Sequence, residues 1–191
     1  MPSRRRLQGP ASSRRSDRAQ HWYCYTLESA AAAPLSSSSC ARRQRRTYVG
    51  KTNCLQRRVD QHNGVRRGGA RSTHADRPWY IAFYVKGFAN ETEALQFEWR
   101  MHNPPRDSVV AAAIGAGRTR QRSGLLGRVH SLVGVCSLER WTRSSPLASE
   151  RPITVVWRPE LAALLARYRS RFPPHVRHEI ATESARGLHQ Q

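Results

Sequence analysis

The segment "RRTYVGKTNCLQRRVDQHNG", residues 45–64, constrains the fold most, because it joins a strand pattern directly to a helix pattern. The run "TYVG" is apolar and β-branched, which is typical of a strand. In "CLQRRVDQHN" Leu55 and Val59 stand four residues apart and predict one buried side of a helix. Asn53 is placed to cap the start of this helix and Gly64 to end it. The segment therefore predicts a strand followed at once by a short amphipathic helix.

Further strands and a second helix are expected on either side of this unit. The aromatic run "HWYCYTLES" precedes it, separated by the low-complexity loop "AAAAPLSSSSCARRQRR", and "WYIAFYV" is the clearest strand in the chain. In "NETEALQFEWRMHNPP" Asn90 can cap a helix, Glu93 completes a capping box, and Pro104 stops the helix. The first two strands are expected to form an antiparallel hairpin, or the start of a small sheet, with an unusually long connection.

Composition shifts along the chain divide it into five parts. The first is polar and rich in Arg and Ser, so it is expected to be a disordered basic tail. The part after Pro105 reads as a linker, followed by helix patterns around one strand, "RPITVVW". The expected boundaries are a tail over 1–20, the main domain over 21–105, a linker over 106–123, a helical extension over 124–172 and a flexible tail over 173–191.

The chain is strongly basic, with a formal net charge of +20, and all but Lys51 and Lys86 of its 33 basic residues are arginine. Such a balance favours a polyanion, because neutralising phosphates releases counterions and Arg binds phosphate oxygens in a fork. A biased genome can also produce an arginine excess, so charge alone does not decide the function. The four cysteines show no metal-ligand spacing, and no apolar run is long enough to span a membrane.

Several residues have the chemistry that phosphodiester cleavage requires. Such a reaction needs a carboxylate for a hard divalent cation, a cation to face the phosphate, and a group that deprotonates water. Glu98 lies between two aromatic residues, and Arg58 and His62 share one helix face. Tyr25 and Tyr48 lie on the short strands next to them.

Each of these residues also has a purely structural explanation. Tyrosines in strands usually pack in the core, and a histidine near a helix C-terminus is favoured by the helix dipole alone. Glu98 could simply pair with one of the many arginines, and exposed arginines are usually solvated. Spacing alone therefore leaves the choice between enzyme and binding protein open.

The order of the motifs resembles the GIY-YIG nucleases. "YCY" stands where that family has its first triplet and "YVG" where it has its second, with Arg58 eight residues after Gly50 and Glu98 beyond a further strand. Within the family, the segments "YVGKTNCLQRRVDQHNG", "GGARST" with "RPW", "VKGF" and "ALQFEW" resemble the catalytic subunit of the SLX-type structure-specific endonuclease. The first triplet departs from the family pattern at Tyr23, which replaces a glycine. The resemblance covers roughly residues 22–104.

The resemblance implies an α/β (α+β) fold, in which a small three-stranded antiparallel sheet is flanked by helices. A mostly helical extension is expected to follow it. It implies that Tyr25 and Tyr48 are the paired tyrosines, that Arg58 faces the scissile phosphate, and that Glu98 binds one divalent metal, Mg²⁺ or Mn²⁺. His62 matches a position near the site. Which tyrosine activates water stays open.

On this basis the helix after "YVG" is expected to present Arg58 and His62 to the phosphate, while Gly50 lets the chain turn. Arg57 points about 100° away from Arg58 on a helix, so it is expected to be an ordinary basic contact. The expected DNA-binding residues are Lys51, Arg57, Arg66, Arg67 and Arg71.

The expected function is metal-dependent nicking of flaps, forks and four-way junctions in DNA repair and recombination, in the nucleus, with branched DNA and a scaffold subunit as partners. Two alternatives remain: a catalytically weak or silent DNA-binding module, and a GIY-YIG nuclease of the homing or restriction kind. No cysteine follows Cys136. The RING-type zinc domain that normally closes the SLX-type subunit is therefore not expected in this chain.

Overall fold

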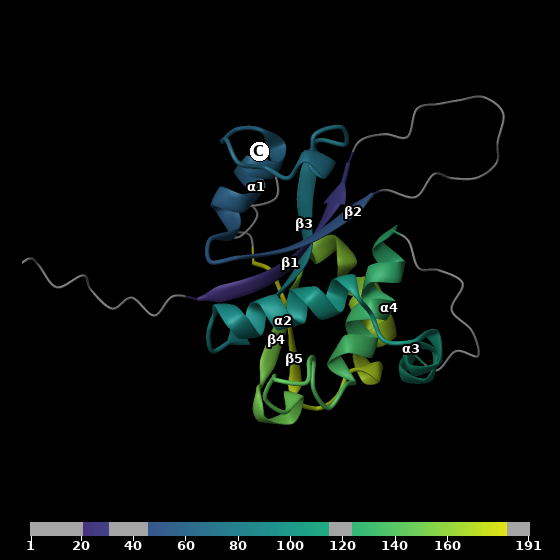
Figure 1. Cartoon of the computed structure of the whole chain (residues 1–191). Helices are drawn as coiled ribbons and strands as arrows, with labels where there is room; N and C mark the ends of the chain where they lie inside the picture. The colour runs from purple at the N-terminus through teal and green to yellow at the C-terminus, as the bar shows by residue number, and fades with distance from the viewer. Residues whose placement is uncertain (1–20, 31–45, 115–123, 183–191) are drawn as a thin grey trace, which may run out of the picture.

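A five-stranded mixed sheet in the order β2-β1-β3-β4-β5 forms the centre of the molecule (Figure 1). The computed structural model describes residues 21–30, 46–114 and 124–182. Strands β1 to β4 pair antiparallel, and β5 pairs parallel with β4 at the edge. The strands are β1 Trp22–Ser29, β2 Thr47–Thr52, β3 Trp79–Phe88, β4 Ile153–Trp157 and β5 Val176–Ile180.

Helices cover both faces of this sheet. The α-helices are α1 Leu55–Asn63, α2 Glu91–His102, α3 Asp107–Ile114, α4 Gly124–Cys136 and α5 Ala162–Tyr168. Short 3-10 helices are η1 Arg71–Thr73, η2 Ala148–Glu150, η3 Pro159–Leu161 and η4 Arg169–Arg171.

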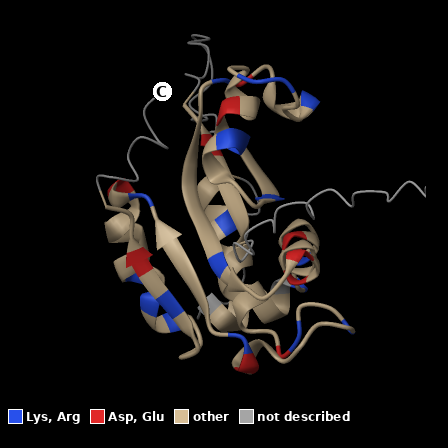
Figure 2. Ribbon diagram, turned by 90° about the vertical axis from the view of Figure 1, so that its left-hand side faces the viewer, with Lys and Arg blue, Asp and Glu red and all other residues tan. Residues whose placement is uncertain are grey.

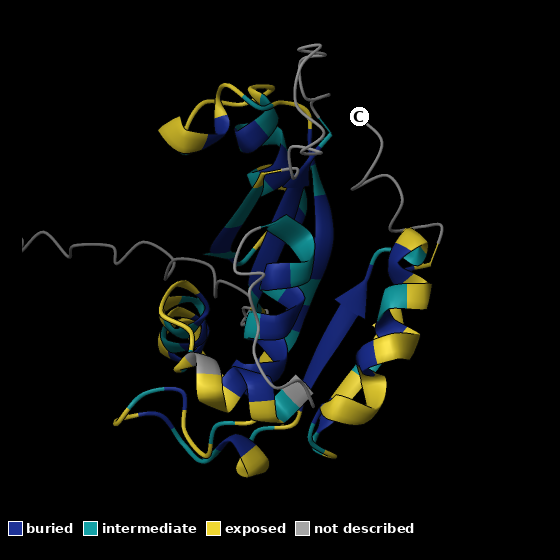
Figure 3. Ribbon diagram, turned by 90° about the vertical axis from the view of Figure 1, so that its right-hand side faces the viewer, coloured by how far each residue is buried: buried dark blue, intermediate teal, exposed yellow. Residues whose placement is uncertain are grey.

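Alternation along β1 separates two hydrophobic clusters, because successive strand residues point to opposite faces. Tyr25 and Leu27 pack with α1 through Leu55 and Val59. Cys24 belongs to the larger cluster, to which α2 and α4 contribute. With both faces covered, β1 is buried from its third residue onward, and the strands are mostly dark blue in Figure 3.

The register between β1 and β2 brings the two predicted tyrosines to one face. Tyr25 lies opposite Gly50, and Leu27 lies opposite Tyr48. Because Tyr25 and Leu27 are two residues apart, they point the same way, and so do their partners. The hairpin predicted from "YCY" and "YVG" therefore supplies both tyrosines to the face that α1 covers.

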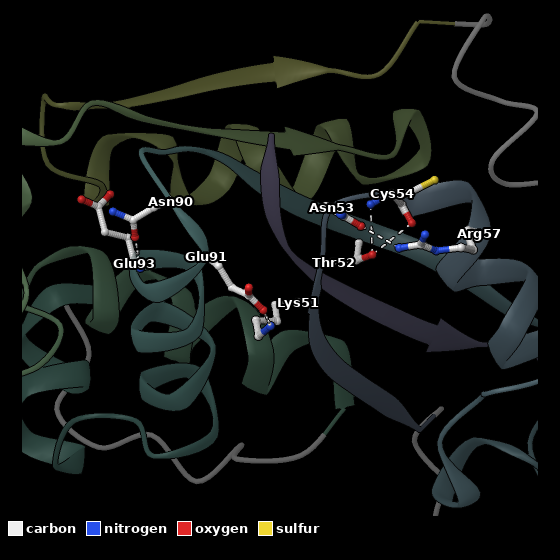
Figure 4. A network of polar contacts seen from close by, with 8 residues as sticks. All are labelled: Lys51, Thr52, Asn53, Cys54, Arg57, Asn90, Glu91 and Glu93. Atoms are coloured by element: carbon white, nitrogen blue, oxygen red, sulfur yellow. Dashed lines mark hydrogen bonds and ion pairs between the residues drawn. The ribbon is translucent and has the colours of Figure 1, made fainter. Parts of the chain in front are cut away.

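The start of α1 differs from the prediction. Its N-cap residue is Cys54, and the Asn53 side chain does not cap the helix but accepts a hydrogen bond from Arg57 Nη2 at 2.6 Å. Thr52 instead accepts a hydrogen bond from the Cys54 backbone N–H at 3.1 Å (Figure 4). The end of α1 is as predicted, since Gly64 adopts the left-handed conformation at φ 82° that favours glycine.

Helix α2 begins as its sequence predicts. Asn90 is the N-cap and its side chain accepts from the Glu93 backbone N–H at 3.0 Å. The Glu93 carboxylate turns back to accept from the Ala89 N–H at 2.9 Å and also pairs with Arg151 at 2.9 Å. This start fixes the rotation of α2 and buries Phe97 against the sheet.

The α+β fold class is confirmed, but the sheet is larger than the three strands expected. "RPITVVW" adds β4 to the same sheet through pairs such as Phe83 with Trp157. Residues 107–114, within the expected linker, form α3, which packs on α4 through Val110 and Gly134. Residues 176–180, within the expected flexible tail, form β5. In each case burial against a distant segment provides the stability that the local sequence lacks.

Some expectations concern parts of the chain outside the described residues. These are the basic tail over 1–20, most of the long loop before β2, and the linker segment 115–123. None of the described helices combines the length and apolar character needed to cross a membrane.

Candidate active site

Tyr25 is the centre of a buried polar cluster between β1, α1 and β2. The residue is 1% exposed, and its hydroxyl lies 2.9 Å from His62 Nε2. The same oxygen accepts a hydrogen bond from Arg58 Nε at 3.0 Å. Burial is the main cause that raises the pKa of Tyr25 well above its ordinary value, although Arg58 opposes the shift. Tyr25 is therefore a neutral phenol held between a base and a cation.

Gly50 lies inside β2 and not at a turn, so the expectation that it lets the chain turn is wrong. It stands opposite Tyr25 in the sheet, and the missing side chain leaves room for the tyrosine ring. The glycine of "YVG" is thus required because it has no side chain, and not because of its backbone conformation.

His62 lies behind Tyr25, completely buried at 0% exposure. Its Nδ1 lies 3.0 Å from Thr73 Oγ1, and its backbone carbonyl accepts from Arg77 Nε at 2.8 Å. Burial, followed by the charges of Arg58 and Arg77, lowers the pKa of His62 to about 4. The expectation that α1 presents His62 to the phosphate is therefore wrong, because this ring reaches Tyr25 and not the surface.

Arg58 is fixed in place by several acceptors. Besides Tyr25, its Nη1 donates to Gln61 Oε1 and to the Gly68 carbonyl, both at 3.0 Å. Burial lowers the pKa of Arg58, but its interactions with Tyr25 and Tyr48 raise it above the ordinary value. The guanidinium is thus a permanent cation in a defined orientation.

Tyr48 and Glu98 lie around this cluster, closer to solvent than Tyr25. The Tyr48 ring packs 4.7 Å from the His62 ring, centroid to centroid, and 6.4 Å from the Tyr25 ring. The Glu98 side chain is 19% exposed on α2. Burial raises the pKa of Glu98, while the charges of Lys51 and Arg58 lower it. His102, one turn along the helix, comes within 3.9 Å of the Glu98 carboxylate.

The donor set around Glu98 suits a hard cation that keeps most of its own water. Within the described segments no group of three or more His, Cys, Asp or Glu side chains is arranged to hold a metal ion. Mg²⁺ is usually bound through one or two carboxylates together with water and substrate phosphate oxygens. A single, partly exposed carboxylate on α2 fits that mode of binding and does not fit a closed structural metal site.

The five residues expected to contact DNA differ in their surroundings. Lys51 forms an ion pair with Glu91 (Figure 4). Its Nζ also lies 4.8 Å from the centre of the Trp22 ring. Arg66 pairs with Asp60 at 3.0 Å. Figure 2 shows basic residues spread over several elements, with acidic residues among them. Arg57, Arg67 and Arg71 are exposed.

Thr73 and Gln61 also belong to this cluster, although neither is among the residues predicted from the sequence. Thr73 bonds to His62, and Gln61 accepts from Arg58. Gln61 follows Arg58 by three residues on one helix, a spacing that could have suggested the contact. The contact of Thr73 with His62 joins η1 to α1 across 11 positions, so local sequence carried no signal for it.

Comparison with known families gives one match, to the N-terminal half of the described chain. Residues 21–107 match the family model described as the GIY-YIG catalytic domain. This range includes all five candidate site residues: Tyr25, Tyr48, Arg58, His62 and Glu98. The resemblance read from the sequence is confirmed.

Several curated proteins named as structure-specific endonuclease subunits are similar to this chain. SLX1 of Podospora anserina is 38% identical over 109 residues, covering 49% of this chain and 32% of the relative. The slx1 protein of Schizosaccharomyces japonicus is 42% identical over 123 residues, covering 63% of this chain and 41% of the relative. The slx1 protein of Aspergillus terreus is 37% identical over 100 residues, covering 49% and 26%. The matched part is thus less than half of each of these relatives.

Proposed function

We propose that the chain is a metal-dependent, structure-specific DNA endonuclease, because residues 21–107 match the GIY-YIG catalytic domain. It hydrolyses phosphodiester bonds near branch points such as flaps, forks and four-way junctions. The observation that carries this proposal is the Tyr25 hydroxyl held between His62 Nε2 at 2.9 Å and Arg58 Nε at 3.0 Å, with Glu98 nearby. A merely DNA-binding module has no need of a buried neutral imidazole behind a tyrosine.

Glu98 would hold the divalent metal, Mg²⁺ or Mn²⁺. When bound, such an ion polarises the phosphate and stabilises the departing oxygen. The carboxylate supplies one oxygen ligand, and the nearby Lys51 and Arg58 charges offset part of the increase in its pKa that burial causes. Arg58 contributes a fixed positive charge toward the phosphorus, where negative charge increases during attack.

Tyr25 and His62 form a proton relay for the attacking water. A water proton moves to Tyr25 Oη as the water oxygen attacks phosphorus, and the phenolic proton moves to His62 Nε2. Tyr25 never has to exist as a free phenolate, which its raised pKa disfavours. The relay also favours Tyr25 over Tyr48 as the activating residue, because Tyr25 is the one bonded to the imidazole.

The relatives are named as subunits. We therefore extend the proposal to a scaffold subunit as partner and to repair and recombination in the nucleus. The arginine-rich composition supports a DNA substrate, because many phosphate contacts release many counterions.

Cleavage of labelled flap, fork and four-way-junction DNA with Mg²⁺ tests the proposal, with linear duplex of the same sequence as the reference. We expect branched DNA to be nicked near the branch and the duplex to stay intact. Glu98→Gln and Arg58→Ala should each abolish nicking, while mobility-shift assays should still detect junction binding.

Two results would contradict this function. Branched DNA that stays uncut at stoichiometric protein, with and without a scaffold subunit, would favour a silent DNA-binding module. Cutting of duplex DNA at one defined sequence would favour a homing or restriction activity.

A further inference from the structure

We propose that Thr73 is a positioning residue that determines which ring nitrogen of His62 carries the proton, so that the other nitrogen faces Tyr25 as an acceptor. The inference rests on the proposed function, because it concerns the relay of the same site. Thr73 is the last residue of η1 and is completely buried. It lies on the far side of His62 from Tyr25 and cannot touch the substrate itself.

The hydroxyl of Thr73 has one proton, and the geometry assigns it. Thr73 Oγ1 donates to the Ala70 carbonyl at 2.7 Å. Thr73 Oγ1 can then only accept in its 3.0 Å contact with His62, so the imidazole Nδ1–H must be the donor. His62 is therefore protonated at Nδ1 and carries its lone pair at Nε2.

The Tyr25 side of the ring agrees with this assignment. The Tyr25 oxygen already accepts the Arg58 Nε proton, so its own proton is free to be donated to His62 Nε2 at 2.9 Å. In the opposite tautomer an N–H at Nε2 would point at the same oxygen and compete with Arg58. The phenolic proton could then not pass to the imidazole, and the relay would be blocked.

The segment that carries Thr73 is fixed on its other side by Trp79. The indole Nε1 of Trp79 donates to the Thr73 carbonyl at 2.7 Å. Asn63, at the end of α1, bonds to both the backbone N–H and the carbonyl of Trp79, at 2.7 and 3.0 Å. The threonine is thus tied to β3 and, through Asn63, to the same helix that carries His62.

Thr73→Val tests this role, because valine has the same shape but offers no acceptor to Nδ1–H. We expect two-bond ¹H–¹⁵N NMR spectra of the unliganded protein to show His62 as the Nδ1–H tautomer in the wild type. In Thr73→Val the Nε2–H tautomer should gain population, and junction cleavage should fall about 100-fold with unchanged DNA binding. Thr73→Ser should restore both the tautomer and most of the cleavage.

Thr154→Val is the matched control, since it removes another buried hydroxyl, in β4 and away from the cluster. It should leave the His62 spectrum and the cleavage rate as in the wild type. A wild-type His62 protonated at Nε2 would overturn the inference directly, even if Thr73→Val did not fold. Equal loss of cleavage in Thr73→Ser and Thr73→Val, with an unchanged tautomer, would also overturn it and indicate a packing role.

The NMR measurement needs no DNA, so the two proposals can fail separately. A protein that cuts no branched DNA refutes the proposed function, while the tautomer still tests the Thr73 contact. A protein that cuts normally in the Thr73→Val form refutes the inference and leaves the proposed function intact.

Discussion

The Tyr25 ring lies so close to Gly50, its partner across the two strands, that a Cβ at position 50 would come within 2.3 Å of Tyr25 Oη and 2.6 Å of Cζ. Real Cβ atoms do not tolerate such contacts. The ring cannot move without leaving His62 and Arg58, because its hydroxyl bonds to both. The geometry of the site therefore depends on the absence of a side chain in the neighbouring strand.

Gly50→Ala should displace Tyr25 and disable the site. We expect cleavage of junction DNA to fall by about 100-fold or more, because small misplacements of reacting groups are costly. The free energy of unfolding, measured in urea, should fall by about 1–3 kcal/mol through overpacking. Gly134→Ala is the control, because it also adds a crowded Cβ but does so away from the site. This Cβ would lie 2.8 Å from Cγ2 at the end of the Val110 side chain. Normal cleavage by Gly50→Ala would show that Tyr25 position is unimportant.

Arg58→Lys should abolish most cleavage although the charge is kept. A lysine cannot reproduce the separate contacts that Nε makes to Tyr25 and Nη1 makes to Gln61 and Gly68. We expect about a 100-fold lower cleavage rate at unchanged junction affinity. The adjacent Arg57→Lys should cut normally, because Arg57 bonds to Asn53 on the other side of α1. If both lysine variants behaved alike in a single-turnover assay, the distinct role of Arg58 would be refuted.

Acid should destabilise the fold through His62. Its pKa is lowered to about 4 in the folded protein from an ordinary value of 6.5, so the unfolded state binds the proton more readily. The contribution of neutral His62 to the free energy of unfolding should therefore be fully present above about pH 6.5. It should decrease as the pH falls toward 4. The groups that face His62 are Tyr25, Tyr48, Arg58, Thr73 and Arg77.

Urea titrations between pH 4 and 8 measure this linkage. Compared with His62→Gln, the wild type should take up about one more proton on unfolding near pH 5, and no extra proton near pH 8. His178→Gln is the control for another histidine whose pKa burial lowers to about 4. That variant should lose its own proton uptake and keep the contribution of His62. Identical pH slopes for wild type and His62→Gln would mean that His62 titrates normally.

Local sequence predicted the elements of the part that matches the GIY-YIG catalytic domain, because their signals are local. The Asn90 cap, the Gly64 helix end and the two strands that carry Tyr25 and Tyr48 each depend on residues within a few positions. The same reasoning predicted Asn53 as the N-cap of α1. The helix begins one residue later, so Cys54 is the N-cap and its backbone N–H bonds to Thr52.

What sequence could not supply depends on contacts between distant segments. Tyr25 meets His62 across 37 positions, and nothing near either residue shows that the imidazole is buried behind the phenol. Strand β5 is short and polar, and only its pairing with β4 makes it a strand. The same applies to α3, an alanine-rich segment that resembles a linker until Val110 packs on α4.

Trp157→Ala should destabilise residues 21–107 and the C-terminal extension together, because one sheet runs through both. Trp157 is completely buried in β4, with its ring 5.1 Å from the Phe83 ring on β3. Replacing a buried tryptophan by alanine lowers the free energy of unfolding by about 3–5 kcal/mol. Because β3 also pairs with β1, amide hydrogen exchange should accelerate in β1 and β2 as well as in β4. Ile180→Ala, at the half-exposed edge of β5, should cost less than about 1 kcal/mol and leave exchange in β1 unchanged. If Trp157→Ala accelerated exchange in β4 and β5 alone, the extension would be an independent folding unit and the continuous sheet would not transmit stability to the site.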